Sequence, residues 1–126
     1  MRLSTALIVE IHRRLIETSG GSFGIRDAGL LDSAVNTIYQ TNDGRELYPS
    51  ALDKAARLCF GLIKNHPFVD GNKRIAMHML ALFLRFHDLP YKPSNEDVVH
   101  IGVSLASNNM SYEALRAWIQ YVCGGL

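Results

Sequence analysis

Hydrophobic residues recur every three or four positions along most of the chain, which is the spacing of one buried helix face. Asp27 and Ser111 stand before two of these stretches as candidate helix caps, and Ser94 to Asp97 has the form of a capping box that opens another helix. The pattern predicts an all-α fold of about six helices. The hydrophobic stripes lie at Leu7, Ile8, Ile11 and Leu15, at Leu31, Ala34, Val35 and Ile38, at Ala51, Ala55, Leu58 and Leu62, and at Leu115, Trp118, Ile119 and Val122.

One stretch differs from the others because it is apolar on every side. Residues Ile75 to Leu84 read IAMHMLALFL, and such a helix is normally surrounded by other helices. We expect it to be the central, buried helix of the bundle. His78 is expected to be a hydrogen-bonded core histidine, with a supporting role at a site as the alternative. A group at the N-terminal end of this helix then has a rigid support.

Three breaks interrupt the helical pattern. Residues 19–24, with the sequence SGGSFG, predict a mobile loop that exposes Phe23. Residues 41–44 predict a turn, and residues 88–93 form a connector that is able to pair as a short strand. Neither repeats nor low-complexity segments accompany these breaks.

The composition limits the classes of function. A chain of 126 residues has room for a single domain, expected to span residues 1–126. Thirteen Lys and Arg residues against twelve Asp and Glu residues give a net charge of +1, so binding to nucleic acid or to an anionic membrane loses its usual driving force. Cys59 and Cys123 make neither a disulfide scaffold nor a zinc site, which favours a reducing, cytoplasmic location.

The segment that carries chemistry is His66 to Arg74, with the sequence HPFVDGNKR. Pro67 disfavours helical geometry at the residue before it, so the preceding helix should end at His66. Residues 71–74 then occupy the first turn of the central helix, where backbone N–H groups lack partners and the helix dipole adds partial positive charge. Such a helix start is an anion site, and Gly71 lets a phosphate oxygen approach closely.

The side chains of this segment add to the anion site. Lys73 and Arg74 place two cations at the positive end of a helix, an arrangement that an anionic ligand explains and helix stability does not. Asp70 is a carboxylate of the kind that holds Mg²⁺ together with phosphate oxygens, and His66 supplies an imidazole, a group able to take a proton from a hydroxyl. Each residue alone, Asn72 included, has an ordinary explanation as a cap, a loop residue or a solvated charge. Their joint occurrence predicts a site for phosphoryl or nucleotidyl transfer.

The segment HPFVDGNKR resembles the motif HPFx[D/E]GN[G/K]R of the Fic family at every fixed position. The short, helical chain is most similar to the Doc (death-on-curing) toxin branch, and the stretch GGSFGIRDAGLLDSA supports this similarity less specifically. The resemblance implies a Fic fold, a compact bundle in which the central helix follows the motif loop.

The resemblance also implies a role for each motif residue. His66 would be the general base that activates a target hydroxyl, and Asp70 would hold Mg²⁺. Gly71 and Asn72 would line the turn that binds the phosphates of ATP, and Phe68 would anchor the loop in the core.

The same resemblance gives Lys73 and Arg74 a part both in binding ATP and in catalysis, and Arg74 would contact the phosphates. Family members that transfer AMP generally carry Gly at the position of Lys73, which leaves a hollow for the distal phosphates of ATP. A lysine would fill that hollow, so that the γ-phosphate lies beside His66 and is transferred. The implied reaction is phosphorylation of a Thr or Ser hydroxyl. AMP transfer remains the alternative, because Gly71 and Pro67 follow the general Fic pattern.

Partners and a biological role follow from the resemblance as well. Doc toxins phosphorylate a threonine of elongation factor Tu, which stops protein synthesis, and they pair with a Phd antitoxin whose disordered tail folds as a helix on the toxin. The sequence has no match to [S/T]xxxE[G/N], the inhibitory pattern of many Fic proteins, which favours an external inhibitor of this kind. Residues 20–24 are a candidate flap for a target peptide, with a plain interhelical turn as the alternative.

Two further alternatives come from other classes of protein. One is a ribonuclease-type toxin or DNA-binding repressor, and the other is a catalytically inactive binding module. The net charge and the lack of a basic stripe argue against a nucleic-acid ligand. An inactive module would keep its toxicity in a His66→Ala variant.

Overall fold

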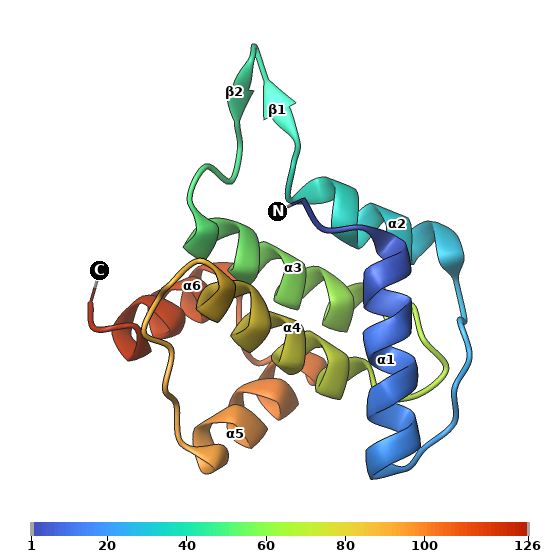
Figure 1. The fold of residues 1–126 in the computed structure, drawn as a ribbon. Helices are drawn as coiled ribbons and strands as arrows, with labels where there is room; N and C mark the ends of the chain where they lie inside the picture. Colours follow the sequence, from blue (N-terminus) through green and yellow to red (C-terminus); the bar gives the residue numbers. More distant parts are fainter. Residues whose placement is uncertain (1, 126) are drawn as a thin grey trace.

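The computed structural model describes residues 2–125, which form a helical bundle with one small two-stranded ladder (Figure 1). Within these residues, the prediction of an all-α fold of about six helices is confirmed. None of the helices in this part of the chain has the length and apolar character needed to cross a membrane. The elements are α1 (Thr5–Ser19), α2 (Ala28–Thr37), β1 (Thr41–Asn42), β2 (Arg45–Glu46), α3 (Ala51–Asn65), α4 (Asn72–Phe86), α5 (Asn95–Ala106) and α6 (Tyr112–Val122).

The centre of the bundle is the pair of helices α3 and α4. They lie side by side, and residues 66–71 reverse the chain between them (Figure 1). Helices α2 and α6 pack on α3, α5 packs on both central helices, and α1 crosses α4 at the end where α4 begins. The loop between α3 and α4 is therefore held by both central helices and by α1.

Side-chain caps fix where most of the helices begin. Ser4, Asp27, Ser94 and Ser111 each accept a hydrogen bond from a backbone N–H in the first turn of the helix that follows. At α3 the Ser50 side chain accepts from Asp53 N–H, and the Asp53 carboxylate accepts from Ser50 N–H, which completes a capping box. The caps predicted from sequence at positions 27, 94 and 111 are thus confirmed. Of the capping box expected at Ser94 to Asp97, the hydrogen bonds described for residues 2–125 include only the bond from Asp97 N–H to Ser94 Oγ.

Helix α4 is buried on most of its surface but not on all of it. Met79 and Leu80 are fully buried, whereas His78 is exposed. The prediction of a helix buried on every side, with a core histidine, is therefore wrong. The face that carries His78, Ala81 and Arg85 lines a cavity, and apolar residues on that face are cavity wall instead of core.

The buried face of α1 is rotated from the predicted stripe. Leu7 is 37% exposed, and the buried residues are Ile8, His12 and Ile16, each separated from the next by four positions. A histidine thus occupies a core position that the sequence pattern assigned to aliphatic neighbours, because its ring has polar and aromatic partners described below.

The one ladder of strands in residues 2–125 is a hairpin that projects away from the helices (Figure 1). Thr41 pairs with Glu46 and Asn42 with Arg45, and the two residues between them have positive φ. Positive φ at both central positions is the conformation that favours two-residue hairpins. The turn predicted at residues 41–44 is confirmed, and the pairing expected of residues 88–93 is not present.

Asp53→Asn tests how the N-terminal end of α3 is held. Burial alone would raise the pKa of Asp53, but hydrogen bonds from Arg116 and Ser50 outweigh burial and keep this pKa below its usual value. The carboxylate therefore stabilises the fold above about pH 4, and that contribution is lost as the pH falls through the lowered pKa. We expect the variant to lose about 1 kcal/mol of unfolding free energy at pH 7, measured by urea denaturation.

The difference from the unmodified protein should shrink in acid, and a loss that is equal at pH 7 and in acid would contradict the ionic role of Asp53. Asp43→Asn is the matched control. Asp43 is exposed in the hairpin turn, and asparagine tolerates its left-handed backbone, with φ 52°, equally well.

Candidate active site

The motif predicted from sequence forms the loop that joins α3 to α4. Helix α3 ends at His66, as the proline after it predicted. His66 itself adopts the left-handed conformation, with φ 48° and ψ 55°. Gly71, with φ 78°, is the N-cap of α4 and has no side chain to cap the helix. The first turn of α4 therefore begins at Asn72, and its N–H groups point toward the loop opening.

The amide of Asn72 closes this loop. Its Oδ1 accepts from Phe68 N–H at 2.9 Å, and its Nδ2 donates to Phe68 O at 2.9 Å and to Nδ1 of His66 at 3.1 Å. The two bonds to the Phe68 backbone fix which end of the amide is oxygen and which is nitrogen. Because Nδ1 of His66 is the acceptor, the neutral imidazole carries its proton on Nε2.

Beneath the loop, Phe68 is fully buried, and the ring of His12 from α1 stacks on it with 3.7 Å between centroids. His12 is 1% exposed, and its Nε2 donates to the backbone oxygen of Asp70 at 2.7 Å. Burial lowers the pKa of His12, so the ring is neutral at neutral pH. The role of Phe68 as an anchor, which the family resemblance implied, agrees with this burial.

The carboxylate of Asp70 is held by backbone donors. Its Oδ2 accepts from Ser22 N–H at 3.1 Å, and its Oδ1 accepts from Gly71 N–H at 2.9 Å. These bonds keep the pKa of Asp70 below its usual value, so the group is ionised at neutral pH. A Cβ on Gly21 would lie 2.5 Å from Asp70 Oδ2, so this close approach of the two loops requires glycine.

The loop between α1 and α2 lies along the motif loop. Ile25 and Phe68 form an antiparallel bridge, Val69 N–H donates to Gly24 O at 2.9 Å, and Arg26 N–H donates to Pro67 O at 2.7 Å. The segment that the sequence marked as a candidate flap is thus bonded to the motif. Phe23, predicted to be exposed, is 38% exposed.

The two basic residues of the motif differ in their surroundings. Lys73 is exposed. Arg74 donates through Nη1 to Ser19 Oγ at 3.1 Å and to Gly20 O at 2.7 Å, which ties the start of α4 to the end of α1.

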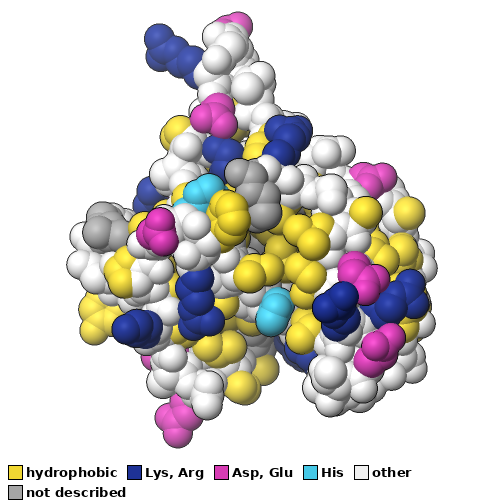
Figure 2. Space-filling model, in the orientation of Figure 1, with side chains coloured by type: hydrophobic (Ala, Val, Ile, Leu, Met, Phe, Trp, Pro, Cys, Tyr) yellow, Lys and Arg dark blue, Asp and Glu magenta, His cyan; other side chains and the backbone are white. Residues whose placement is uncertain are grey.

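All six residues predicted for the site line one cavity of about 880 Å³. From the motif the cavity extends along α4 and α5, past Ala81 and Arg85 to Val99 and Val103. On the face shown in Figure 2, hydrophobic side chains gather over the helices, with Lys and Arg side chains on either side. The residues predicted for the site that meet in this cavity are His66, Asp70, Gly71, Asn72, Lys73 and Arg74.

The donor set of the cavity fits Mg²⁺ better than a transition metal. Residues 2–125 contain no group of three or more His, Cys, Asp and Glu side chains arranged around a metal position. Mg²⁺ is commonly bound by one or two carboxylates together with water and phosphate oxygens. Asp70, ionised and next to the N-terminal turn of α4, is the residue that would hold it.

Sequence analysis missed three residues that shape the site: His12, Arg26 and Gly21. His12 follows Ile8 by four positions and precedes Ile16 by four, so the spacing of a buried helix face was the available signal. Gly21 and Arg26 lie in the stretch GGSFGIRDAGLLDSA that supported the family resemblance, but nothing local in it indicates their contacts with the motif, as the 40 positions between Arg26 and His66 illustrate.

The fold and the site together define a helical protein in which a histidine loop leads into the open start of a central helix. A model of the Fic/DOC family matches residues 2–84, and the chain belongs to this family. It is also similar to Toxin Doc of Mycolicibacterium smegmatis (strain ATCC 700084 / mc(2)155), with 46% identity over 68 residues. That match covers 54% of this chain and 52% of the relative, so the chain spans about half the length of the curated relative it matches.

Gly21→Ala tests the contact between the two loops. The added Cβ would collide with the Asp70 carboxylate, so the hydrogen bond from Ser22 N–H should be lost. Gly20→Ala is the matched control, since Gly20 also has positive φ but has nothing within 4 Å of the added Cβ. We expect the Ser22 amide to exchange with solvent about tenfold faster in the first variant, for a lost hydrogen bond of roughly 1.4 kcal/mol, measured by NMR. Equal acceleration in both variants would show that backbone strain, and not contact with Asp70, determines the loop position.

Proposed function

We propose that this protein is the toxin of a toxin–antitoxin pair, and that it transfers the γ-phosphate of ATP to a Thr or Ser hydroxyl of a translation factor. The observation that carries the proposal is the convergence of His66, Asp70 and the open first turn of α4 on one cavity. Family membership and the similarity to Toxin Doc support the toxin role. Elongation factor Tu is the proposed target, and the cytoplasm is the proposed location.

ATP would bind with its phosphates at the start of α4. Ile75 N–H donates to Gly71 O and so makes the first backbone hydrogen bond of α4. The N–H groups of residues 72–74 have no partner within the helix and would face the phosphates. The helix dipole and the charges of Lys73 and Arg74 then act on the same anion. Asp70 would hold Mg²⁺, which when bound offsets the charge of the phosphates.

His66 would accept the proton of the target hydroxyl. In the transfer step the hydroxyl oxygen bonds to the γ-phosphorus, the bond from that phosphorus to the β,γ-bridging oxygen breaks, and the hydroxyl proton goes to the imidazole as ADP leaves. Acceptance at Nε2 requires the ring proton to sit on Nδ1, which gives up the bond from Asn72. Loss of that bond costs about 1 kcal/mol. This cost is small for the reaction, because in a loose transition state little proton transfer to the base is needed before the phosphoryl group has moved.

The enzymatic proposal is tested with purified protein, γ-³²P-ATP, Mg²⁺ and cell extract. We expect label on one protein band, lost in His66→Ala and kept in His78→Ala, because His78 lines the same cavity away from the motif. Mass spectrometry of the target should show an addition of about 80 Da for phosphate, against about 329 Da for AMP.

If the target is labelled only from α-³²P-ATP, the reaction is AMP transfer and not phosphorylation. Toxicity that persists in His66→Ala would favour an inactive binding module, and RNA cleavage without ATP would favour a ribonuclease-type toxin.

We further propose that a Phd-like antitoxin covers the part of the cavity formed by α4 and α5. Val99 and Val103 lie one turn apart on α5 and are 65% and 51% exposed, which is unusual for valines that line a cavity. Arg85 of α4 also lines the cavity. An amphipathic helix with one apolar face and acidic flanks fits this combination of surfaces.

Val103→Asp tests the antitoxin surface. In the background of His66→Ala, to avoid toxicity, we expect the affinity for the antitoxin to fall about tenfold or more, as for a central interface residue. Leu47→Asp is the control, because Leu47 is 49% exposed but follows the hairpin. Calorimetry that gives the same affinity for both variants would place the antitoxin elsewhere.

A further inference from the structure

The position of His66 depends on a residue outside the cavity. His66 is one of four residues other than glycine with positive φ in residues 2–125. A left-handed conformation is unfavourable for such a residue, so neighbouring groups must hold it in place. It also lies at the C-terminal end of α3, where the last backbone carbonyls have no donor within the helix.

Arg26 supplies those donors. Its Nε donates to His66 O at 2.6 Å, and its Nη2 donates to Asn65 O at 2.8 Å. The planar guanidinium matches two neighbouring acceptors with two fixed N–H groups, which a lysine does not offer. Its positive charge also complements the C-terminal end of the α3 dipole.

The backbone of Arg26 is itself held in place by hydrogen bonds, so its guanidinium holds the His66 backbone in a fixed position. The backbone N–H groups of Arg26 and Asp27 both donate to Pro67 O, at 2.7 and 3.0 Å. The Asp27 side chain caps α2 by accepting from Leu30 N–H at 3.0 Å. Thus the start of α2 is bonded to the peptide between Pro67 and Phe68. The guanidinium is bonded to the two peptides on either side of the His66 Cα.

We infer that Arg26 is a positioning residue for His66, resting on the function proposed above. Asn72 holds the imidazole at Nδ1, and Arg26 holds the backbone from which the side chain projects. The Arg26 side chain is exposed, so it is not part of the core, and it is not among the residues that line the cavity. Removing the Arg26 side chain therefore creates no cavity in the core. The expected effect is a change in the position of the His66 ring.

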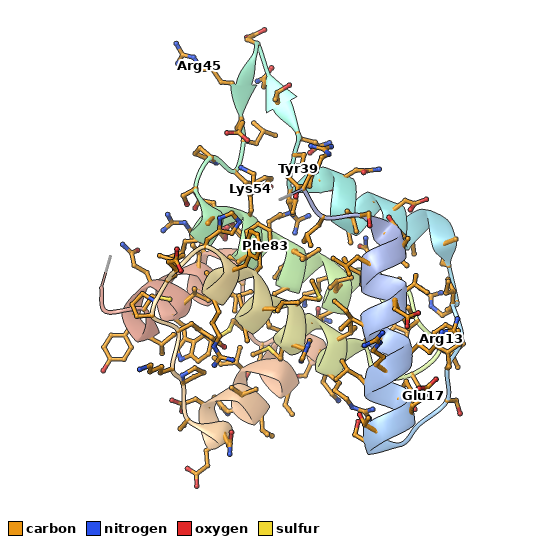
Figure 3. All side chains as sticks on the ribbon, viewed as in Figure 1. Arg13, Glu17, Tyr39, Arg45, Lys54 and Phe83 are labelled. Atoms are coloured by element: carbon orange, nitrogen blue, oxygen red, sulfur yellow. The ribbon has the colours of Figure 1, made fainter. Side chains whose placement is uncertain are left out.

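The test compares Arg26→Met and Arg26→Lys with Arg45→Met. Arg45 is an exposed arginine of the hairpin, which points away from the body of the molecule (Figure 3). In the transfer assay, Arg26→Met should lower kcat about tenfold or more with KM for ATP changed less than twofold, because misplacing a reacting group costs rate and not ground-state binding. Arg26→Lys should recover part of the rate, and Arg45→Met should match the unmodified protein.

A readout without activity separates this inference from the proposed function. The imidazole NMR signals of His66, assigned by their loss in His66→Gln, should shift in Arg26→Met, while those of His78 stay in place. If the unmodified protein transfers no phosphate, a shifted His66 signal still supports the positioning role. Unshifted His66 signals in Arg26→Met would overturn it, as would a KM that rises in proportion to the loss of rate.

Discussion

The hydrogen bonds of one buried amide hold the candidate site together. Asn72 is 5% exposed, and its side chain satisfies both backbone groups of Phe68 while reaching His66. Without it, the N–H and C=O of a buried residue would lack partners, at a cost of about 1–3 kcal/mol each. With it, the loop closes into a small ring of chain that keeps Phe68 in the core and His66 at the edge of the cavity.

A second layer of contacts surrounds that ring. The α1–α2 loop adds backbone bonds along residues 67–69 and a donor to the Asp70 carboxylate. The last residue of α1 and the first residue of the loop each add an acceptor for Arg74. The two bonds of Arg74 both use Nη1, so within the described part of the chain Nε and Nη2 keep donors for an anion. Tethering the start of α4 and contacting a phosphate are therefore compatible roles for the same side chain.

Local patterns were enough to predict the helices and the residues of the motif. Nine consecutive residues carry the chemistry, and Pro67 and Gly71 determine how they turn, so the convergence of His66, Asp70 and Arg74 needed no knowledge of distant parts. Contacts with His12 and Arg26 could not be predicted in this way, because 58 and 40 positions separate the partners along the chain. The error at His78 has another cause: helical periodicity identifies apolar faces but does not distinguish a face in the core from one that lines a cavity.

The charged side chains are unevenly distributed, which the net charge of the chain does not show. The chain as a whole carries +1, too little to attract a polyanion over a distance. Yet Lys73, Arg74 and Arg85 line the cavity, and Asp70 is the one carboxylate among the lining residues of the part that the structure describes. The partial charge at the start of α4 adds to this local excess. A compact anion that enters the cavity therefore meets a positive field that an extended nucleic acid on the outer surface does not, which is why overall neutrality argues against RNA or DNA and not against a nucleotide.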